Sequence, residues 1–239
     1  MSNVRILTVF WSSGRGLGWH QPACCDQPPA KRNSLTGREG PRGELAELVG
    51  IPELTEEKSS NVSVGLTWNP RPAFDLTVDA YQIDIDDRIV LTGGFTTDDP
   101  DIGHIIAEQN LVEARFFTNA IDTRTRGVDI TAGHRATLSG GRLTTTAALN
   151  LNETDVTNVN TAPGLAGKED IYFNTRERMF VEGSAPKTKG AVTFDYDRSR
   201  WNGGLKFAYF GSLESGTWTQ IDDPSAPPQR YDARVTTDV

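Results

Sequence analysis

The stretch 142–152 alternates between two kinds of side chain, and this pattern limits the fold more than any other feature of the chain. Successive side chains of an extended strand point to opposite faces, so a period of two predicts a strand with one apolar and one polar face. The mainly apolar set is Leu143, Thr145, Ala147, Leu149 and Leu151. The polar side chains opposite them, which would line a lumen if the sheet closed, are Arg142, Thr144, Thr146, Asn150 and Asn152.

Similar alternation recurs along the chain and predicts about seven strands joined as an all-β, antiparallel up-and-down meander. The expected strands are residues 61–68, 74–85, 116–138, 142–152, 189–197, 201–211 and 232–239. Past Tyr81 the apolar positions change parity to Ile83 and Ile85, which indicates either a β-bulge or passage of the strand above an apolar band.

The connections between these strands alternate in length. Three are short (69–73, 139–141 and 198–200), and three are long (about 88–115, 153–187 and 212–231). A meander places every long connection at the same end of the sheet. Outer-membrane β-barrels have this arrangement, with short periplasmic turns and long extracellular loops, whereas a soluble β-sandwich has no reason for it.

Four aromatic residues flank the short turns, where a membrane interface would lie. This expected interface girdle is Trp68, Phe74, Tyr196 and Trp201. Together with the loop lengths, the girdle favours part of a transmembrane β-barrel over a sandwich. Alternation alone does not separate the two, because a sandwich also buries one face of each sheet.

The overall charge and hydropathy exclude two classes of protein. The formal net charge is −8, from 24 basic and 32 acidic side chains, which argues against a nucleic-acid partner because such proteins need a basic face. The longest uninterrupted apolar run is only residues 207–210, whereas a membrane-spanning helix needs roughly 20 mostly apolar residues.

Residues 1–43 differ from the rest of the chain. They hold six basic and two acidic side chains, together with both cysteines, Cys24 and Cys25, whereas residues 44–239 hold 18 basic and 30 acidic. We therefore expect an atypical basic head at 1–43, either disordered or not part of the fold, and a single β domain at 44–239. The apolar stretch 6–11 is too short for a secretion signal, so none is expected in this chain.

Three consecutive segments resemble the TonB-dependent outer-membrane receptors. Residues 53–66 are similar to the family pattern L-x-P-E-x-S-x-N-x-S-x-G, with Thr55 at the usual proline. Residues 76–89 are close to L-T-V-D-Y-Y-x-I-D-I-x-D-R-I, and residues 116–129 to F-x-N-x-x-x-x-x-x-x-G-x-D. The resemblance covers about residues 44–239.

This resemblance implies that the chain is a piece of a plugged barrel of about 22 strands, drawn from its later strands. It implies insertion in the outer membrane of a Gram-negative bacterium, with lipid around the barrel. The function it implies is uptake of a large, scarce extracellular ligand such as an iron chelate, cobalamin or an oligosaccharide. TonB would supply the energy through a plug domain absent from this chain, and the long loops would form part of the ligand mouth.

Two other functions stay open, a soluble non-catalytic β-sandwich that binds a glycan or another ligand, and a passive porin. An enzyme is not expected, because the sequence has no nucleophile–base pattern and no metal-ligand spacing. No cofactor is expected either. Arg124 and Arg126 are expected to point into the lumen or to pair with Asp122 and Asp129.

Overall fold

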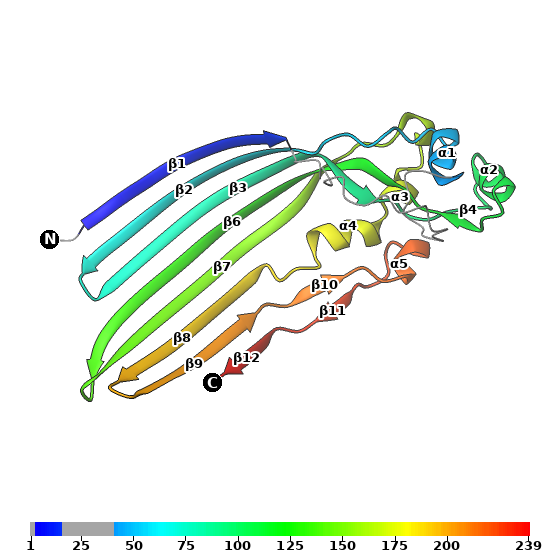
Figure 1. Ribbon diagram of the computed structural model, residues 1–239. Helices are drawn as coiled ribbons and strands as arrows, with labels where there is room; N and C mark the ends of the chain where they lie inside the picture. Colours follow the sequence, from blue (N-terminus) through cyan, green and yellow to red (C-terminus); the bar gives the residue numbers. More distant parts are fainter. Residues whose placement is uncertain (1–2, 16–40) are drawn as a thin grey trace, which may run out of the picture.

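One large antiparallel sheet dominates the computed structural model, which describes residues 3–15 and 41–239. The sheet has eight strands in the order β1-β2-β3-β6-β7-β8-β9-β12, so each strand pairs with its neighbours along the meander. It is not closed, because β1 and β12 lie at opposite edges (Figure 1). Its strands are β1 (Asn3–Arg15), β2 (Lys58–Arg71), β3 (Phe74–Leu91), β6 (Phe117–Leu138), β7 (Gly141–Val159), β8 (Thr188–Arg198), β9 (Trp201–Phe210) and β12 (Arg234–Asp238).

The fold class predicted from the sequence is confirmed. All seven predicted strands form, in the predicted order, and they join one sheet rather than dividing into two packed sheets. We call this eight-stranded sheet the wall.

Residues 1–43 were expected to be disordered or not part of the fold, but one segment of them joins the sheet. Asn3–Arg15 forms β1 and pairs antiparallel with β2 along nearly its whole length. This segment is rich in isoleucine, valine, threonine and aromatic residues, which favour strands, and it supplies hydrogen-bond partners for an edge of β2 that would otherwise be unpaired. Residues 16–40, with Cys24 and Cys25, lie outside the described residues.

Two strands continue well past their predicted ends. β7 extends to Val159 rather than residue 152, and β3 to Leu91 rather than residue 85. The added part of β7 has lost the apolar alternation but still pairs residue by residue with β6, as in Arg126 opposite Glu153. Cross-strand pairs of opposite charge stabilise a strand there without a hydrophobic signal.

The turns at one end of the wall are tight. Ser139 and Gly140 alone connect β6 to β7, and both have positive φ, 49° and 77°. Two residues with positive φ match the twist of a two-residue hairpin, and glycine adopts this conformation without steric cost. We call this end the short-turn rim.

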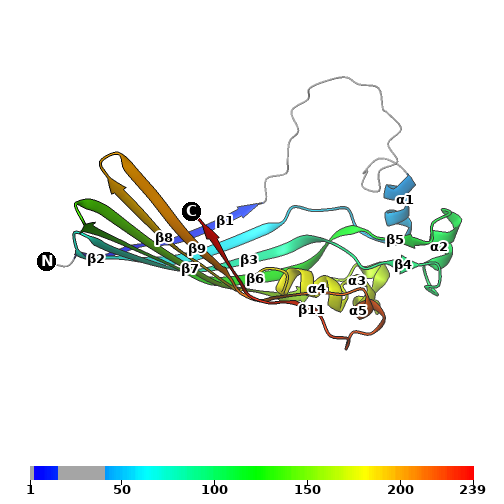
Figure 2. The ribbon, with the colours of Figure 1, turned by 90° about the horizontal axis from the view of Figure 1, so that it is seen from below.

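The long connections carry short helices and two small hairpins at the opposite end of the wall (Figure 2). We call this end, together with the segment before β2, the cap. Its elements are α1 (Pro41–Leu48), β4 (Phe95–Thr96), α2 (Gly103–Glu108), β5 (Glu113–Ala114), η1 (Pro163–Leu165), α3 (Glu169–Tyr172), α4 (Thr175–Glu182), β10 (Leu213–Ser215), α5 (Thr219–Asp222) and β11 (Gln229–Tyr231). No described helix has the length and apolar character needed to cross a membrane.

The buried hydrophobic core lies in the cap and in the strand ends that the cap covers, not along the wall. It includes Phe95, Ile106, Ile121, Leu165 and Tyr172, each almost fully buried. The two ends of the molecule are therefore stabilised in different ways.

Candidate functional site

Register places the apolar side chains of six strands on one face of the wall. Leu66 lies opposite Val78, Val78 opposite Ile130, and the row continues across the sheet. We call this the apolar face. Its members are Val62, Val64, Leu66, Trp68, Phe74, Leu76, Val78, Ala80, Val128, Ile130, Ala132, Leu143, Ala147, Leu149, Leu151, Val192, Phe194, Tyr196, Trp201, Leu205, Phe207 and Tyr209. Many of them stay substantially exposed; Leu149, for example, is 37% accessible. A contiguous apolar surface of this extent needs an apolar partner.

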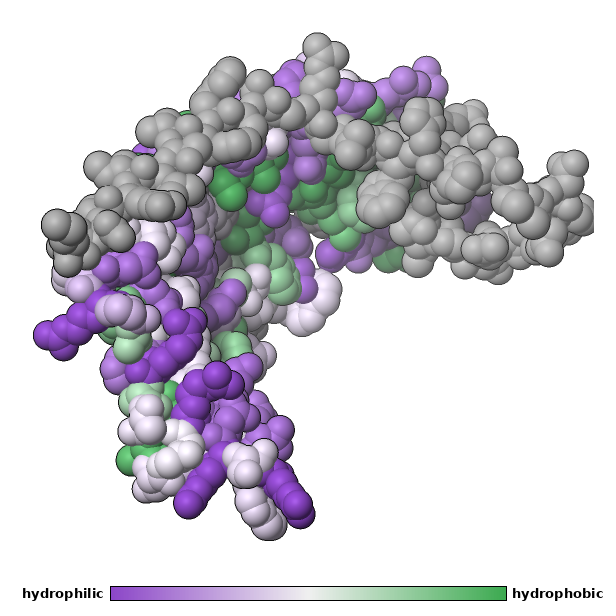
Figure 3. Space-filling model, turned by 60° about the vertical axis from the view of Figure 1, so that its left-hand side comes forward, coloured by the Kyte–Doolittle hydropathy of each residue, from purple (hydrophilic) through white to green (hydrophobic). Residues whose placement is uncertain are grey.

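The four predicted girdle residues all lie on the apolar face near the short-turn rim. Trp68 pairs with Leu76, and Tyr196 with Leu143. The Tyr196 hydroxyl donates to the Leu138 carbonyl at 3.0 Å, and Trp201 is 81% exposed. Residues beyond them at the rim are mainly hydrophilic, as the lower end of the view in Figure 3 shows. An aromatic band between apolar and hydrophilic surfaces is typical of a membrane interface, so the girdle stays a prediction with suitable geometry.

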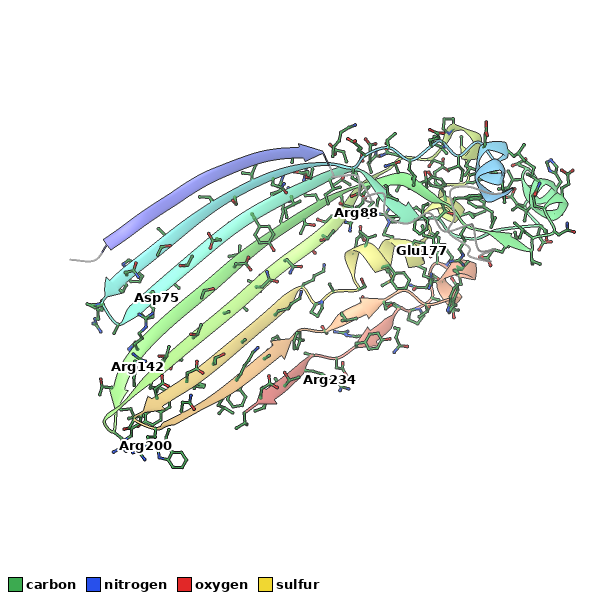
Figure 4. All side chains as sticks on the ribbon, viewed as in Figure 1. Asp75, Arg88, Arg142, Glu177, Arg200 and Arg234 are labelled. Carbon is green, nitrogen blue, oxygen red and sulfur yellow. The ribbon has the colours of Figure 1, made fainter. Side chains whose placement is uncertain are left out.

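The five predicted lumen residues share the opposite face of β7, which we call the polar face. Arg142 is an ion-pair partner of Asp197 at 3.5 Å near the short-turn rim (Figure 4). Further along β7, Asn152 Nδ2 donates to Asn150 Oδ1 at 2.5 Å, and Asn150 Nδ2 donates to Asp129 Oδ1 at 2.6 Å. Thr144 and Thr146 lie between these two groups. Whether this face lines a lumen stays a prediction.

Tyr81 and Gly127 form a close pair on the polar face that sequence reasoning missed. A Cβ atom built on Gly127 would lie 2.3 Å from the ring of Tyr81, so the ring covers the glycine. Asn150 Nδ2 also reaches the Tyr81 hydroxyl at 3.4 Å. The sequence signal for this pair is Gly127 of the G-x-D motif together with Tyr81, the aromatic residue of the preceding strand that lies opposite it.

The change of parity past Tyr81 has a definite cause. The β2–β3 and β3–β6 registers are continuous through residues 76–85, and the first shift falls after Ile85. No bulge therefore occurs at Tyr81. Gln82 and Asp84 continue the apolar face as polar residues, which agrees with a strand that has passed above the apolar band.

Arg124 forms an ion pair, as one of the two predicted alternatives has it, but its partner is Asp84 rather than Asp122 or Asp129. Arg124 and Arg126 have the parity of Val128 and so extend the apolar face, whereas Asp129 lies on the polar face. Arg124 Nε lies 2.5 Å from Asp84 Oδ1, and Arg126 Nε donates to Gln82 Oε1 at 2.9 Å. Above the apolar band, polar residues occupy the face that is apolar lower down, so the polarity of Arg124 and Arg126 does not indicate their direction.

The three long connections meet at an exposed tryptophan in the cap. Trp218, in the third, is 64% exposed. The guanidinium of Arg176, in the second, lies 4.0 Å from its ring centroid, and that of Arg115, in the first, lies 5.4 Å away. Among the described residues, Arg176 Nε is buried without a hydrogen-bond partner. We call these three residues the loop junction.

Acidic residues balance the charge of the loop junction. Glu177 Oε1 lies 2.7 Å from Arg176 Nη1 and 3.9 Å from Arg115 Nη1 (Glu177 is labelled in Figure 4). Glu113 Oε1 accepts from Arg115 Nε at 2.7 Å. The junction therefore offers a planar aromatic ring, two guanidinium groups and two carboxylates, which can recognise a polar ligand with a flat group.

A second pair joins the first and second long connections. Lys168 Nζ donates to both oxygens of Asp99, at 2.7 and 2.8 Å, and lies 3.0 Å from Asp101 Oδ2. Burial alone would raise the pKa of the Asp99 carboxyl, but hydrogen bonds from Lys168 and from the backbone amides of Asp101 and Ile102 outweigh burial and lower this pKa. Hydrogen bonds to the carboxylates of Asp99 and Asp101 raise the pKa of Lys168. This pair therefore links the first long connection to the second.

Within residues 3–15 and 41–239, no group of three or more histidine, cysteine, aspartate or glutamate side chains is arranged to hold a metal ion.

Comparison with known proteins gives one family match. The family model described as "TonB dependent receptor-like, beta-barrel" matches residues 28–239. Comparison with curated proteins gives no match.

Several solved structures share the fold. The FrpB iron transporter from Neisseria meningitidis (F3-3 variant) has a TM-score of 0.51 at 12% identity, over 79% of this chain and 24% of that one. The outer membrane transporter YddB from Escherichia coli has a TM-score of 0.50 at 8% identity, over 77% of this chain and 26% of that one. The chain therefore spans about a quarter of the length of these transporters.

Proposed function

Because the chain belongs to the TonB-dependent receptor-like β-barrel family of the Gram-negative outer membrane, we propose that it forms part of a receptor for TonB-energised uptake of a large, scarce ligand. The ligand class we propose is an iron chelate, cobalamin or an oligosaccharide. TonB would act through a plug domain outside this chain. Neither catalysis nor a resident cofactor is part of this proposal.

One observation carries the proposal beyond the family. All three long connections lie at the end of the wall opposite the short turns, and they converge on the loop junction of Arg115, Arg176 and Trp218. We propose that this junction lies in the extracellular mouth and contacts the ligand. An exposed tryptophan with two guanidinium groups offers stacking and charge-assisted hydrogen bonds to the same ligand.

Uptake in the source bacterium tests the transport step. The radiolabelled ligands to be offered are an iron chelate, cobalamin and a maltodextrin, each under conditions in which it limits growth. We expect deletion of the gene to abolish the uptake of one of them. Deletion of TonB should have the same effect. Uptake that is lost with the gene but persists without TonB would favour the passive porin instead.

Two tryptophans provide matched variants for the mouth. Trp218→Ala removes the ring at the loop junction, whereas Trp201→Ala removes an even more exposed ring at the short-turn rim. We expect about a tenfold loss of ligand affinity in the first variant and little change in the second, because base-like or planar groups gain about 1 to 3 kcal/mol from aromatic stacking. Equal affinities in the two variants would place the ligand elsewhere.

We also keep the domain division at residues 43 and 44 as a proposal, supported by the change of charge there. The pairing of β1 with β2 argues against placing residues 3–15 in a separate head, because Asn3–Arg15 belongs to the same sheet. Amide exchange of the chain in lipid vesicles tests this division: protection of residues 3–15 equal to that of β2 would assign β1 to the barrel.

A further inference from the structure

A hollow of about 620 Å³ lies on the apolar face at the height where apolar side chains give way to charged ones. Its floor is one cross-strand row, Val64–Ala80–Val128–Leu151. Ala80 has the smallest side chain of the four, so the wall is recessed where β2, β3 and β6 meet. Apolar atoms dominate this lining.

The rim of the hollow nearest the cap is charged. The next row of the sheet places Gln82 opposite Arg126 and Arg126 opposite Glu153. Lys187 forms an ion pair with Glu153. Two cations and one carboxylate therefore border the hollow.

Arg126 keeps most of its hydrogen-bonding capacity. Its Nε donates to Gln82 Oε1, and the side chain is exposed. Among the described residues, no carboxylate oxygen lies within ion-pair distance of it, although Glu153 is its direct cross-strand neighbour. Both terminal nitrogens of the guanidinium are available to an anion, and a planar guanidinium binds phosphate oxygens in a bidentate manner.

We propose that this hollow is a binding site for a membrane lipid with an anionic phosphate head group. One acyl chain lies over Ala80, between Val64 and Val128, and the phosphate meets Arg126 and Lys187. The apolar face turns polar at this row, which is the height at which a lipid changes from acyl chain to head group. A zwitterionic lipid fills the apolar floor equally well but places a second cation beside Arg126, so charge complementarity favours the anionic lipid. The site requires only that the apolar face contacts lipid, and it is independent of ligand transport.

Native mass spectrometry of the full chain in detergent tests this site. The probes are phosphatidylglycerol and phosphatidylcholine with identical acyl chains, added in equal amounts. We expect the protein to retain phosphatidylglycerol preferentially. Arg126→Gln should reduce that preference about tenfold, the effect of losing one charge-assisted contact. Arg126→Lys should restore part of it.

Two further variants separate the site from general effects. Ala80→Leu fills the hollow and should lower the retention of both lipids. Arg200→Gln removes an exposed cation at the short-turn rim and should leave the preference unchanged (Figure 4). Equal retention of both lipids by the unaltered protein would overturn the proposal, as would equal effects of Arg126→Gln and Arg200→Gln. If Arg126→Gln fails to fold, retention by Ala80→Leu equal to that of the unaltered protein overturns it.

Discussion

The wall and the cap belong to one chain but exclude water by opposite means. In the cap, side chains such as Ile106 and Leu165 are fully buried against one another, as in a soluble domain. Along the wall, apolar side chains such as Val64 and Phe207 remain exposed on one face, with accessibilities of 48% and 39%. The cap removes its apolar side chains from water by packing them together, whereas the wall depends on lipid to do so. The effect of a mutation in the wall should therefore depend on the lipid, and the effect of one in the cap should not.

The largest expected effect is in the cap. Phe95 is 1% exposed and its ring centroid lies 6.2 Å from that of Phe116. Phe95→Ala should destabilise the cap by about 3 to 5 kcal/mol, because it leaves a cavity in a closed core. Hydrogen exchange measured by mass spectrometry should show faster exchange in α2 and α3 but unchanged protection in β7.

The matched control is Phe117→Ala, since Phe117 is the neighbour of Phe116 yet half exposed. It should change cap exchange little. If β7 also lost protection in Phe95→Ala, the wall and the cap would unfold as one unit and the contrast between them would fail.

The next effect is in the wall and depends on lipid. Leu149→Arg places a charge in the middle of the apolar face and should cost about 2 to 4 kcal/mol of folding free energy in a bilayer. Ala148→Arg adds the same side chain one residue away on the polar face, where Ala148 is exposed, and should cost little. Denaturant titration in phospholipid vesicles measures both. Equal costs would mean that the two faces do not differ in environment.

Much of the wall could be predicted from the sequence, because a period of two maps directly onto the faces of a strand. The girdle residues and the polar side chains of β7 accordingly lie together where the pattern places them. The partner of Arg124 could not be predicted, because the polarity of a residue indicates its face only within the apolar band. Above that band, the same sequence pattern fits either an Arg124 that pairs with Asp84 or an Arg124 that points into the lumen.

The cap was far less predictable. Its helices have eight residues or fewer, too short for a 3.6-residue period to stand out. The loop junction combines Arg115, Arg176 and Trp218, which come from three separate connections and meet only through tertiary packing. A single sequence holds no local signal for such a contact.

A smaller effect tests packing on the polar face of the wall. Gly127→Ala should displace the Tyr81 ring and cost about 1 to 3 kcal/mol, because the added methyl would overlap it. Gly203→Ala in β9 is the control, since a Cβ there meets nothing within 4 Å. The same vesicle titration compares them. Rescue of Gly127→Ala by Tyr81→Ala would assign the cost to this pair, whereas additive losses would exclude it.

The smallest effect returns to the cap and depends on pH rather than on lipid. The side chain of Asp99 is 5% exposed and bound by Lys168. The pKa of Asp99 is lower in the folded protein than its ordinary value of about 3.9, so its contribution to stability is complete above that pH and is lost as the pH falls through the folded pKa. The pKa of Lys168 is raised, so its contribution is complete below its ordinary value of about 10.4 and is lost as the pH rises through the raised value.

Asp99→Asn should therefore destabilise the cap near neutral pH by about 1 to 2 kcal/mol, a modest loss because Asp101 still lies beside Lys168. Acidification below about pH 4 should lower the amide protection of the cap, and this drop should be smaller in Asp99→Asn than in the unaltered chain. Exchange of the backbone amides of α2 and α3, compared between pH 7 and pH 3, measures both changes. Asp98→Asn changes the exposed neighbouring carboxyl and should alter neither. An acid response in the cap that is the same in Asp99→Asn as in the unaltered chain would show that other carboxyls control it, and would leave this pair a purely local link between two loops.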